Sequence, residues 1–124
     1  MDSSSGLIDT RNIVAVCLSG DTLDRALLRE MLDYFIHENE RRMVTARQAL
    51  EADDRESLRQ LAHAMRGSAS LLGARRLHDL AWGLEGDALT HDLATLHQTV
   101  ERLGEELTAV VISLRDAHAE VWAD

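Results

Sequence analysis

The segment AHAMRGSASLLGA carries the side chains with the clearest capacity for chemistry in this chain. On a helix that turns about 100° per residue, the apolar residues gather on one face, and His63 lies about 150° from its centre. His63 is therefore predicted to face solvent, with Gly67 and Ser70 on the same face and Arg59 and Arg66 flanking it. A neutral imidazole is a nucleophile near neutral pH, and guanidinium groups stabilise added negative charge.

Gly67 is unexpected in the middle of a helix, where a glycine costs about 1 kcal/mol relative to alanine. A missing side chain one turn from His63 would let a second surface approach the imidazole closely. The alternative is that His63 is an ordinary exposed histidine and that Gly67 is a tolerated weak point. Spacing alone leaves both interpretations open.

The composition indicates a single soluble domain that is rich in helix. The 124 residues are 45% hydrophobic and 28% charged, with no proline and only 3% aromatic residues. The net charge of −9 argues against a general binder of nucleic acid or of anionic membranes. Residues 55–79 nevertheless hold five arginines and two acidic residues, a balance of +3, so the remainder carries −12. This basic segment indicates either a local anionic partner or a solvated arginine face.

The single cysteine and the lack of a long apolar run indicate in which cellular compartment the protein is expected. Cys17 has no second cysteine to pair with and lies among apolar residues, so we expect a buried, reduced thiol. The apolar run at residues 13–18 is too short to span a membrane and lacks the flanks of a signal peptide. A cytoplasmic protein, or a cytoplasmic module of a longer chain, is predicted.

Capping residues and glycines divide the chain into helices. Residues 1–6 are small and polar and are expected to be disordered. The predicted helices cover approximately residues 8–17, 22–52, 54–72, 75–89 and 91–114. The expected boundary residues are Ser19–Gly20 after the first helix, Asp21 or Thr22 before the second, Asp53 or Asp54 before the third, Gly73 after the third, and Thr90 before the last.

The predicted fold is all-α. Short loops between long helices favour antiparallel neighbours, which gives an up-down-up-down four-helix bundle with a short extra N-terminal helix. We expect a bundle domain over residues 7–118 and a C-terminal tail over 119–124, where Trp122 either covers the bundle end or lies in the tail. The last helix has an uninterrupted apolar spacing of three and four residues, formed by Leu93, Leu96, Val100, Leu103, Leu107, Val110 and Leu114.

The segment around His63 resembles the signature of histidine-containing phosphotransfer (HPt) domains of two-component phosphorelays. In that signature the histidine is followed by any residue, an aliphatic residue, Lys or Arg, Gly, and Ser or Ala, and later by Leu-Gly-Ala. Every one of these positions matches. A long aromatic-bearing helix precedes the segment, LHDLAWGLE follows it, and the resemblance extends over about residues 7–114.

The resemblance implies specific roles for several residues. His63 matches the histidine that accepts a phosphoryl group from a receiver-domain aspartate or a kinase and passes it on. Arg66 stands where the family usually has lysine, so the charge is kept but the donor geometry differs. Gly67 matches the glycine that permits receiver docking. Glu85 matches the glutamine or glutamate, 22 residues after the histidine, that bonds the second ring nitrogen.

Helix geometry independently favours a contact between His63 and Glu85. One lies ten residues before the Gly73 turn and the other twelve residues after it, so they stand at similar heights. The alternative is a surface glutamate without a role. His78 and Trp82 share the edge of the fourth helix with Glu85, so they either line a docking surface or are half-buried packing residues. The predicted docking set is Arg59, Gly67, Ser70, His78 and Trp82.

Other features limit the chemistry that the chain can perform alone. It has no glycine-rich phosphate loop, so we expect a phosphoryl carrier without its own ATP site rather than a stand-alone kinase. No metal site is expected, because no two histidines are spaced four residues apart. No cofactor of its own is expected either, and the resemblance implies Mg²⁺ on the partner receiver. The expected partners are response-regulator receivers and a sensor histidine kinase, with no nucleic acid and no membrane, and the chain is expected to be a monomer.

The predicted function is that of a phosphorelay intermediate phosphorylated on His63. One alternative is the HPt module of a hybrid or chemotaxis-type histidine kinase. A second is an HPt-like bundle that regulates a partner by binding without carrying phosphate. A third is a structural adaptor that dimerises through the seam of its last helix.

Overall fold

The computed structural model describes residues 7–123, so the tail predicted at residues 1–6 lies outside the described residues. The described chain is mostly helical, as predicted, with one small antiparallel sheet that was not predicted. In chain order the elements are α1 (Arg11–Val16), β1 (Leu18–Ser19), β2 (Thr22–Leu23), α2 (Arg25–Glu51), α3 (Arg55–Leu71), α4 (Arg75–Asp87), α5 (Leu93–Ala117) and α6 (Ala119–Trp122).

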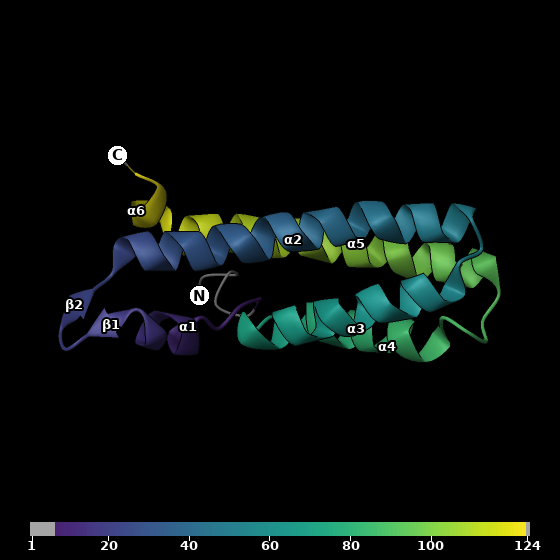
Figure 1. Ribbon diagram of the computed structural model, residues 1–124, viewed down its shortest axis with the longest axis horizontal. Coiled ribbons are helices and arrows are strands. Elements are labelled where there is room, and N and C mark those ends of the chain that lie inside the picture. The colour runs from purple at the N-terminus through teal and green to yellow at the C-terminus, as the bar shows by residue number, and fades with distance from the viewer. Residues whose placement is uncertain (1–6, 124) are drawn as a thin grey trace.

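The four long helices α2, α3, α4 and α5 lie side by side along the long axis of the molecule (Figure 1). Helix α2 packs against α3 and α5, and α4 packs against the same two helices. The segments 52–54 and 72–74 that join α2 to α3 and α3 to α4 are short, so each pair packs as neighbours. This arrangement places α3, which carries His63, between α2 and α4.

Aspartates cap three of the long helices. Asp24, Asp54 and Asp92 each accept a hydrogen bond from the backbone N–H three residues later, at 3.0, 3.1 and 2.8 Å. Asp54 is one of the two predicted caps of the third helix. The second helix was predicted to begin after Asp21 or Thr22 and the last after Thr90, and these caps are wrong.

Both corrections have a local cause. Thr22 is part of the β1–β2 hairpin, so its backbone is extended and α2 starts only after it. Thr90 donates its backbone N–H to Asp87 O at 3.1 Å, which makes it part of the turn that ends α4. Helix α4 accordingly ends at Asp87, two residues before the predicted end.

The N-terminal helix is shorter than the predicted 8–17. The backbone N–H of Asp9 donates to Leu72 O at 3.0 Å, and this contact holds Asp9 outside α1. After α1 the chain reverses at Gly20, whose φ of +62° suits a residue without a side chain, and Leu18 pairs with Leu23 across the hairpin. A two-residue strand is too short to give an alternating pattern in the sequence.

Gly73 ends α3, as predicted. Its φ is +62°, and a Cβ atom at this position would overlap the backbone of Asp9. Both the turn and the close approach of the N-terminal segment therefore require glycine here.

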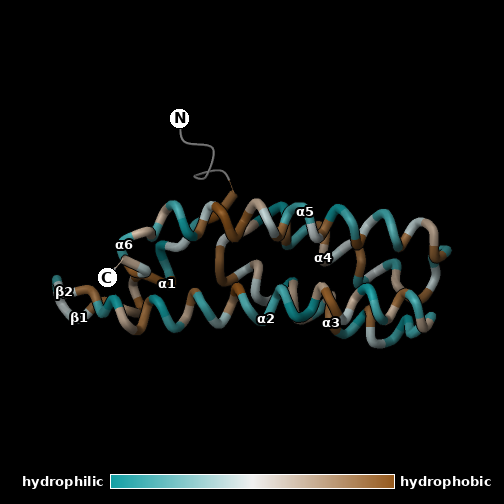
Figure 2. Tube along the Cα trace, turned by 90° about the horizontal axis from the view of Figure 1, so that it is seen from above, coloured by the Kyte–Doolittle hydropathy of each residue, from teal (hydrophilic) through white to brown (hydrophobic). Residues whose placement is uncertain are grey.

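The core lies between the long helices, and hydrophobic and hydrophilic residues alternate along each of them (Figure 2). In the apolar seam predicted for the last helix, every residue except the half-buried Leu93 is buried. Because that seam packs inside this chain, it is not available on the surface for the dimer of the adaptor alternative. The largest fully buried side chains are Leu28, Leu32, Ile36, Leu58, Met65, Leu72, Leu77, Leu84, Leu96, Leu103, Leu114 and Val100.

The expected C-terminal tail includes the short helix α6, which packs on α2 and α5. Val121 is buried, and Trp122 Nε1 donates to Asp33 Oδ1 at 2.8 Å, so Trp122 covers the bundle end. The buried His118 contacts Thr10 Oγ1 through Nε2 at 2.7 Å and ties the N-terminal segment to the end of α5. The domain limits at residues 7 and 118 stay a prediction.

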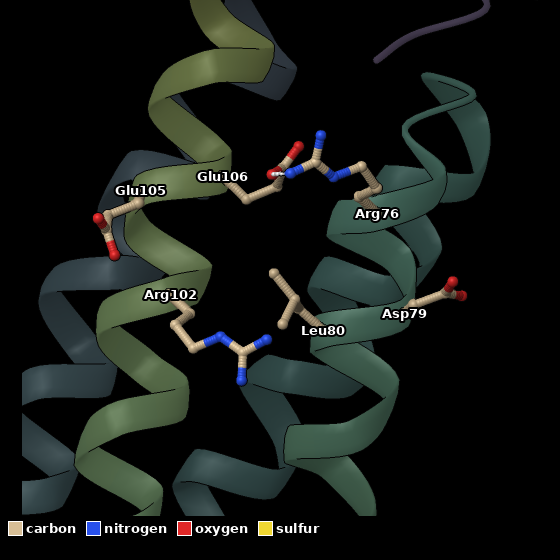
Figure 3. A pocket seen from close by; sticks show the side chains of 6 residues that line it. All are labelled: Arg76, Asp79, Leu80, Arg102, Glu105 and Glu106. Atoms are coloured by element: carbon tan, nitrogen blue, oxygen red, sulfur yellow. Dashed lines mark ion pairs between the residues drawn. The ribbon is translucent and has the colours of Figure 1, made fainter. Parts of the chain in front are cut away.

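An ion pair joins α4 to α5 above a shallow pocket (Figure 3). Glu106 is buried, with its side chain 9% exposed, and its Oε1 lies 3.3 Å from Nη2 of Arg76. Leu80 points into the space between the helices, whereas Asp79 and Glu105 point away from it (Figure 3). Within residues 7–123 no helix is long and apolar enough to cross a membrane.

Candidate functional site

Helix α3 presents His63 to solvent. The imidazole is 63% exposed, and Gly67 and Ser70, one and two turns later, are exposed as well. Met65 and Ala69 on the opposite face are fully buried in the core. The amphipathic pattern of α3 therefore fixes the direction in which the imidazole points, as the sequence predicted.

Glu85 on α4 contacts the imidazole. Its Oε2 lies 2.9 Å from Nδ1 of His63, and its side chain is only 18% exposed. The two residues, expected at similar heights, are thus brought together by the turn at Gly73. A half-buried carboxylate orients the ring more strongly than a fully hydrated one, because fewer water molecules compete for its oxygens.

Arg66 completes a three-membered cluster with His63 and Glu85. Its Nε lies 3.2 Å from Oε1 of Glu85, an ion pair without hydrogen-bond alignment, since that buried oxygen has no hydrogen-bond partner among the described residues. Its Nη2 lies 3.2 Å from Nδ1 of His63. The guanidinium group therefore stands beside the Nδ1 edge of the ring.

The chemistry of these groups decides the tautomer of His63. A carboxylate only accepts hydrogen bonds and a guanidinium group only donates them, so Nδ1 cannot bond to both. If Nδ1 accepted from Arg66, its lone pair would face the carboxylate of Glu85 across 2.9 Å. We therefore assign the proton to Nδ1, which donates to Glu85, and the lone pair to Nε2. The nucleophilic nitrogen is then the one that makes no hydrogen bond or ion pair among the described residues.

Trp82 and His78 extend the site along α4. The Arg66 guanidinium carbon lies 5.7 Å from the centroid of the Trp82 ring, and the His78 ring meets that ring edge-on at 5.6 Å. Trp82 is 58% exposed, so it is not the half-buried packing residue of the alternative interpretation. The His78 side chain is 24% exposed, and its Nδ1 lies 3.0 Å from Oδ1 of Asp79.

A shallow hollow lies between the end of α3 and the start of α4. It brings together Ser70, His78 and Trp82, three residues of the predicted docking set. The complete lining is Ala69, Ser70, Gly73, Ala74, Arg75, His78, Asp79 and Trp82. Four of the lining residues are small, Ala69, Ser70, Gly73 and Ala74, and the exposed Trp82 ring belongs to the same lining.

The arginines of the basic segment at residues 55–79 make different contacts and do not all lie beside His63. Arg59 binds Glu56 one turn away, with its Nε 3.1 Å from Oε2, and this pair holds the pKa of the Glu56 carboxyl below its usual value. Arg55 donates to Ala88 O and His91 O, at 3.2 and 2.5 Å, and so braces the end of α4. Arg59 and Arg66 alone flank His63, so the local positive charge is smaller than the count of five arginines indicated.

The space beside Gly67 is open among the described residues. A Cβ atom built there would meet no heavy atom within 4 Å among residues 7–123 outside its own helical turn. The same holds for Gly83 on α4. No intramolecular contact among the described residues therefore accounts for a glycine one turn from His63.

The sequence did not predict a hydrogen-bonded bridge between α2 and α3 close to the site. Arg42 on α2 donates through Nη1 to Oδ1 of the buried Asn39 at 2.9 Å and to Oγ of Ser68 at 3.0 Å. This bridge holds α3 against α2 one turn beyond His63. An asparagine among the apolar positions of the long helix was the only available signal.

No group of three or more His, Cys, Asp or Glu side chains within residues 7–123 is arranged to hold a metal ion. The exposed imidazole, its carboxylate partner and two flanking arginines form a site that can accept and hold an anionic group on Nε2 of His63.

Comparisons with known proteins concern the family and the fold of the chain. A family model described as Hpt domain matches residues 30–118. The chain is similar in fold to histidine-containing phosphotransfer protein B from Pseudomonas aeruginosa PAO1, with a TM-score of 0.77 and 24% sequence identity over 92% of this chain and 96% of that one. No curated protein gives a significant match.

Proposed function

Since the chain belongs to the Hpt domain family and so serves histidine phosphotransfer in two-component signalling, we propose that it is a phosphorelay intermediate phosphorylated on Nε2 of His63. It accepts the phosphoryl group from a receiver-domain aspartate or from a kinase and passes it to another receiver. The observation that carries this proposal is the contact between Nδ1 and Glu85, which leaves the Nε2 lone pair free on an exposed face.

The transfer step follows from this tautomer. The Nε2 lone pair attacks the phosphorus of an acyl phosphate, the N–P bond forms, and the P–O bond to the aspartate breaks, so that a carboxylate leaves. The imidazole ring gains positive charge as the bond forms. The Nδ1–H···Oε2 hydrogen bond to Glu85 stabilises this charge, and Arg66 offsets the charge of the phosphoryl oxygens. The reverse sequence delivers the group to the next receiver.

Docking of the receiver uses the surface around His63. Gly67 leaves room for the partner's surface to approach the imidazole, and Arg59, Ser70, His78 and Trp82 border that approach. The proposed partners are response-regulator receivers and a sensor histidine kinase. Catalysis then consists largely of positioning and charge stabilisation at the interface.

Several further properties belong to the same proposal. The long helices form an antiparallel up-down-up-down bundle that works as a monomer in the cytoplasm. The protein is a phosphoryl carrier without a cofactor of its own, and the partner receiver supplies Mg²⁺.

The test is phosphorylation of the purified chain by phosphoramidate and, separately, by a phosphorylated receiver domain. We expect one acid-labile phosphoryl group by intact mass, with phosphorus–nitrogen couplings in NMR spectra that place it on Nε2. His63→Gln should abolish it, whereas the control His97→Gln, which removes an exposed histidine of α5, should not. No modification of the wild-type chain by either donor would refute the proposal and favour regulation by binding alone.

A further inference from the structure

The position of Arg66 suggests a second task for Trp82. The guanidinium group lies over the Trp82 ring at 5.7 Å and beside Glu85 Oε1 at 3.2 Å, and these two contacts hold it 3.2 Å from the Nδ1 edge of His63. A cation over the face of an exposed indole ring is attracted by it. The guanidinium group therefore stands beside the Nδ1 edge of the imidazole, and not beside the edge that carries the free Nε2 lone pair.

This resting position keeps the attacking nitrogen open. Phosphoryl oxygens attached to Nε2 would lie beyond the opposite edge of the ring, so Arg66 has to shift toward them. We propose that Trp82 is a positioning residue, which holds Arg66 aside while His63 is unphosphorylated and gives it up when the phosphoryl group arrives. This inference rests on the proposed function and adds to it a residue that sets how favourable phosphorylation is.

The proposal has a definite thermodynamic consequence. A contact that exists only in the unphosphorylated state disfavours phosphorylation by the strength of that contact. An exposed contact between a cation and an indole ring corresponds to about a twofold to fivefold change in an equilibrium constant. Removing the ring should therefore move phosphoryl groups toward this chain by about twofold to fivefold.

This consequence separates positioning from docking. A docking contact changes the rates of transfer in both directions by the same factor. It does not change the final distribution of phosphoryl groups between the two free proteins, because that distribution depends only on the stabilities of the free phosphorylated and unphosphorylated forms. The equilibrium partition is therefore a readout that a purely docking role of Trp82 would leave unaltered.

The experiment measures the partition of phosphoryl groups between this chain and a receiver domain at dilute concentration. Trp82→Ala should shift the partition toward the chain, and Trp82→Phe, which keeps a ring face, should shift it less. In an Arg66→Ala background the effect of Trp82→Ala should disappear. Ile112→Ala, which removes an exposed apolar side chain of α5, should leave the partition unchanged.

A spectroscopic test uses the fact that the chain has only two tryptophans. In a Trp122→Phe background, phosphorylation by phosphoramidate should change the emission of Trp82, and this change should be lost when Arg66→Ala is added. Thermal melts would verify that each variant is folded.

The outcomes distinguish the inference from the function on which it rests. A wild-type chain that takes no phosphoryl group would refute both. A phosphorylated wild-type chain whose partition is unaffected by Trp82→Ala, or whose Trp82 emission changes equally without Arg66, would refute only the positioning role.

Discussion

Replacing Gly67 by glutamine should stabilise the fold and at the same time block phosphoryl transfer from a receiver. A glycine inside a helix is less favourable than a good helix former by about 0.5–1 kcal/mol. The new side chain projects into open space, since its Cβ meets no heavy atom within 4 Å among the described residues outside its own turn. The gain in helix propensity is therefore not offset by a clash, and we expect the melting temperature to rise by about 2–5 °C.

The expected loss of function has a steric cause. A glutamine at position 67 would stand one turn from His63 on the same face, in the space that the proposed docking of a receiver uses. Phosphoramidate is small enough to reach Nε2 past this side chain. Transfer from a phosphorylated receiver should therefore fall by at least tenfold, whereas phosphorylation by phosphoramidate should change little.

Gly83→Gln supplies the matched control. Gly83 is also an exposed helical glycine whose Cβ would meet nothing within 4 Å in residues 7–123, and it lies two residues before Glu85, on a different side of α4. This variant should gain similar stability and transfer normally. Thermal unfolding by circular dichroism and radiolabel transfer on gels measure the two effects. Normal receiver transfer by Gly67→Gln, or a loss of stability, would contradict the explanation given for this glycine.

Two further predictions concern the scaffold. Hydrogen bonds from Ser57 and Thr95 hold the pKa values of the Asp54 and Asp92 carboxyl groups below their usual range. These caps therefore stabilise the fold above about pH 4, and this stabilisation is lost as the pH falls further. The melting temperature of the double variant Asp54→Asn/Asp92→Asn should consequently change less between pH 5 and pH 2 than that of the wild type. Arg76→Met leaves the buried Glu106 carboxylate unpaired, whereas Glu106→Met leaves only an exposed arginine. Arg76→Met should lower the free energy of unfolding in urea by about 1–2 kcal/mol more than Glu106→Met does, and equal losses would contradict this reasoning.

The helices could be predicted from the sequence more reliably than their starting points. Periodic apolar residues identified all four long helices, because burial of one face is the dominant signal in a bundle. The starts of α2 and α5 were misplaced because several residues in a row are competent caps. Thr22 and Asp24 compete before α2, and Thr90 and Asp92 before α5; tertiary and turn contacts decide which one accepts the capping bond.

Some contacts of the site could likewise be predicted from the sequence, whereas others could not. The exposure of His63 and its nearness to Glu85 follow from helix periodicity and rise alone. The contact of Arg66 with Trp82 depends on how α4 is rotated about its own axis, which the spacing of residues does not specify. The ion pair between Arg59 and Glu56 follows from their three-residue separation on one helix, whereas a count of charges over residues 55–79 does not distinguish paired from unpaired arginines.

The brace formed by Arg55 has a consequence for how the protein folds. Its bonds to Ala88 O and His91 O join the start of α3 to the end of α4, and the Gly73 turn joins the opposite ends of the same two helices. The resulting helical hairpin makes contacts between residues that are close in sequence, so it loses little chain entropy on closing. We therefore expect α3 and α4 to pair early in folding, with substitutions between them slowing folding more than they accelerate unfolding. His63 and its partner Glu85 would then meet in the first part of the molecule to become ordered.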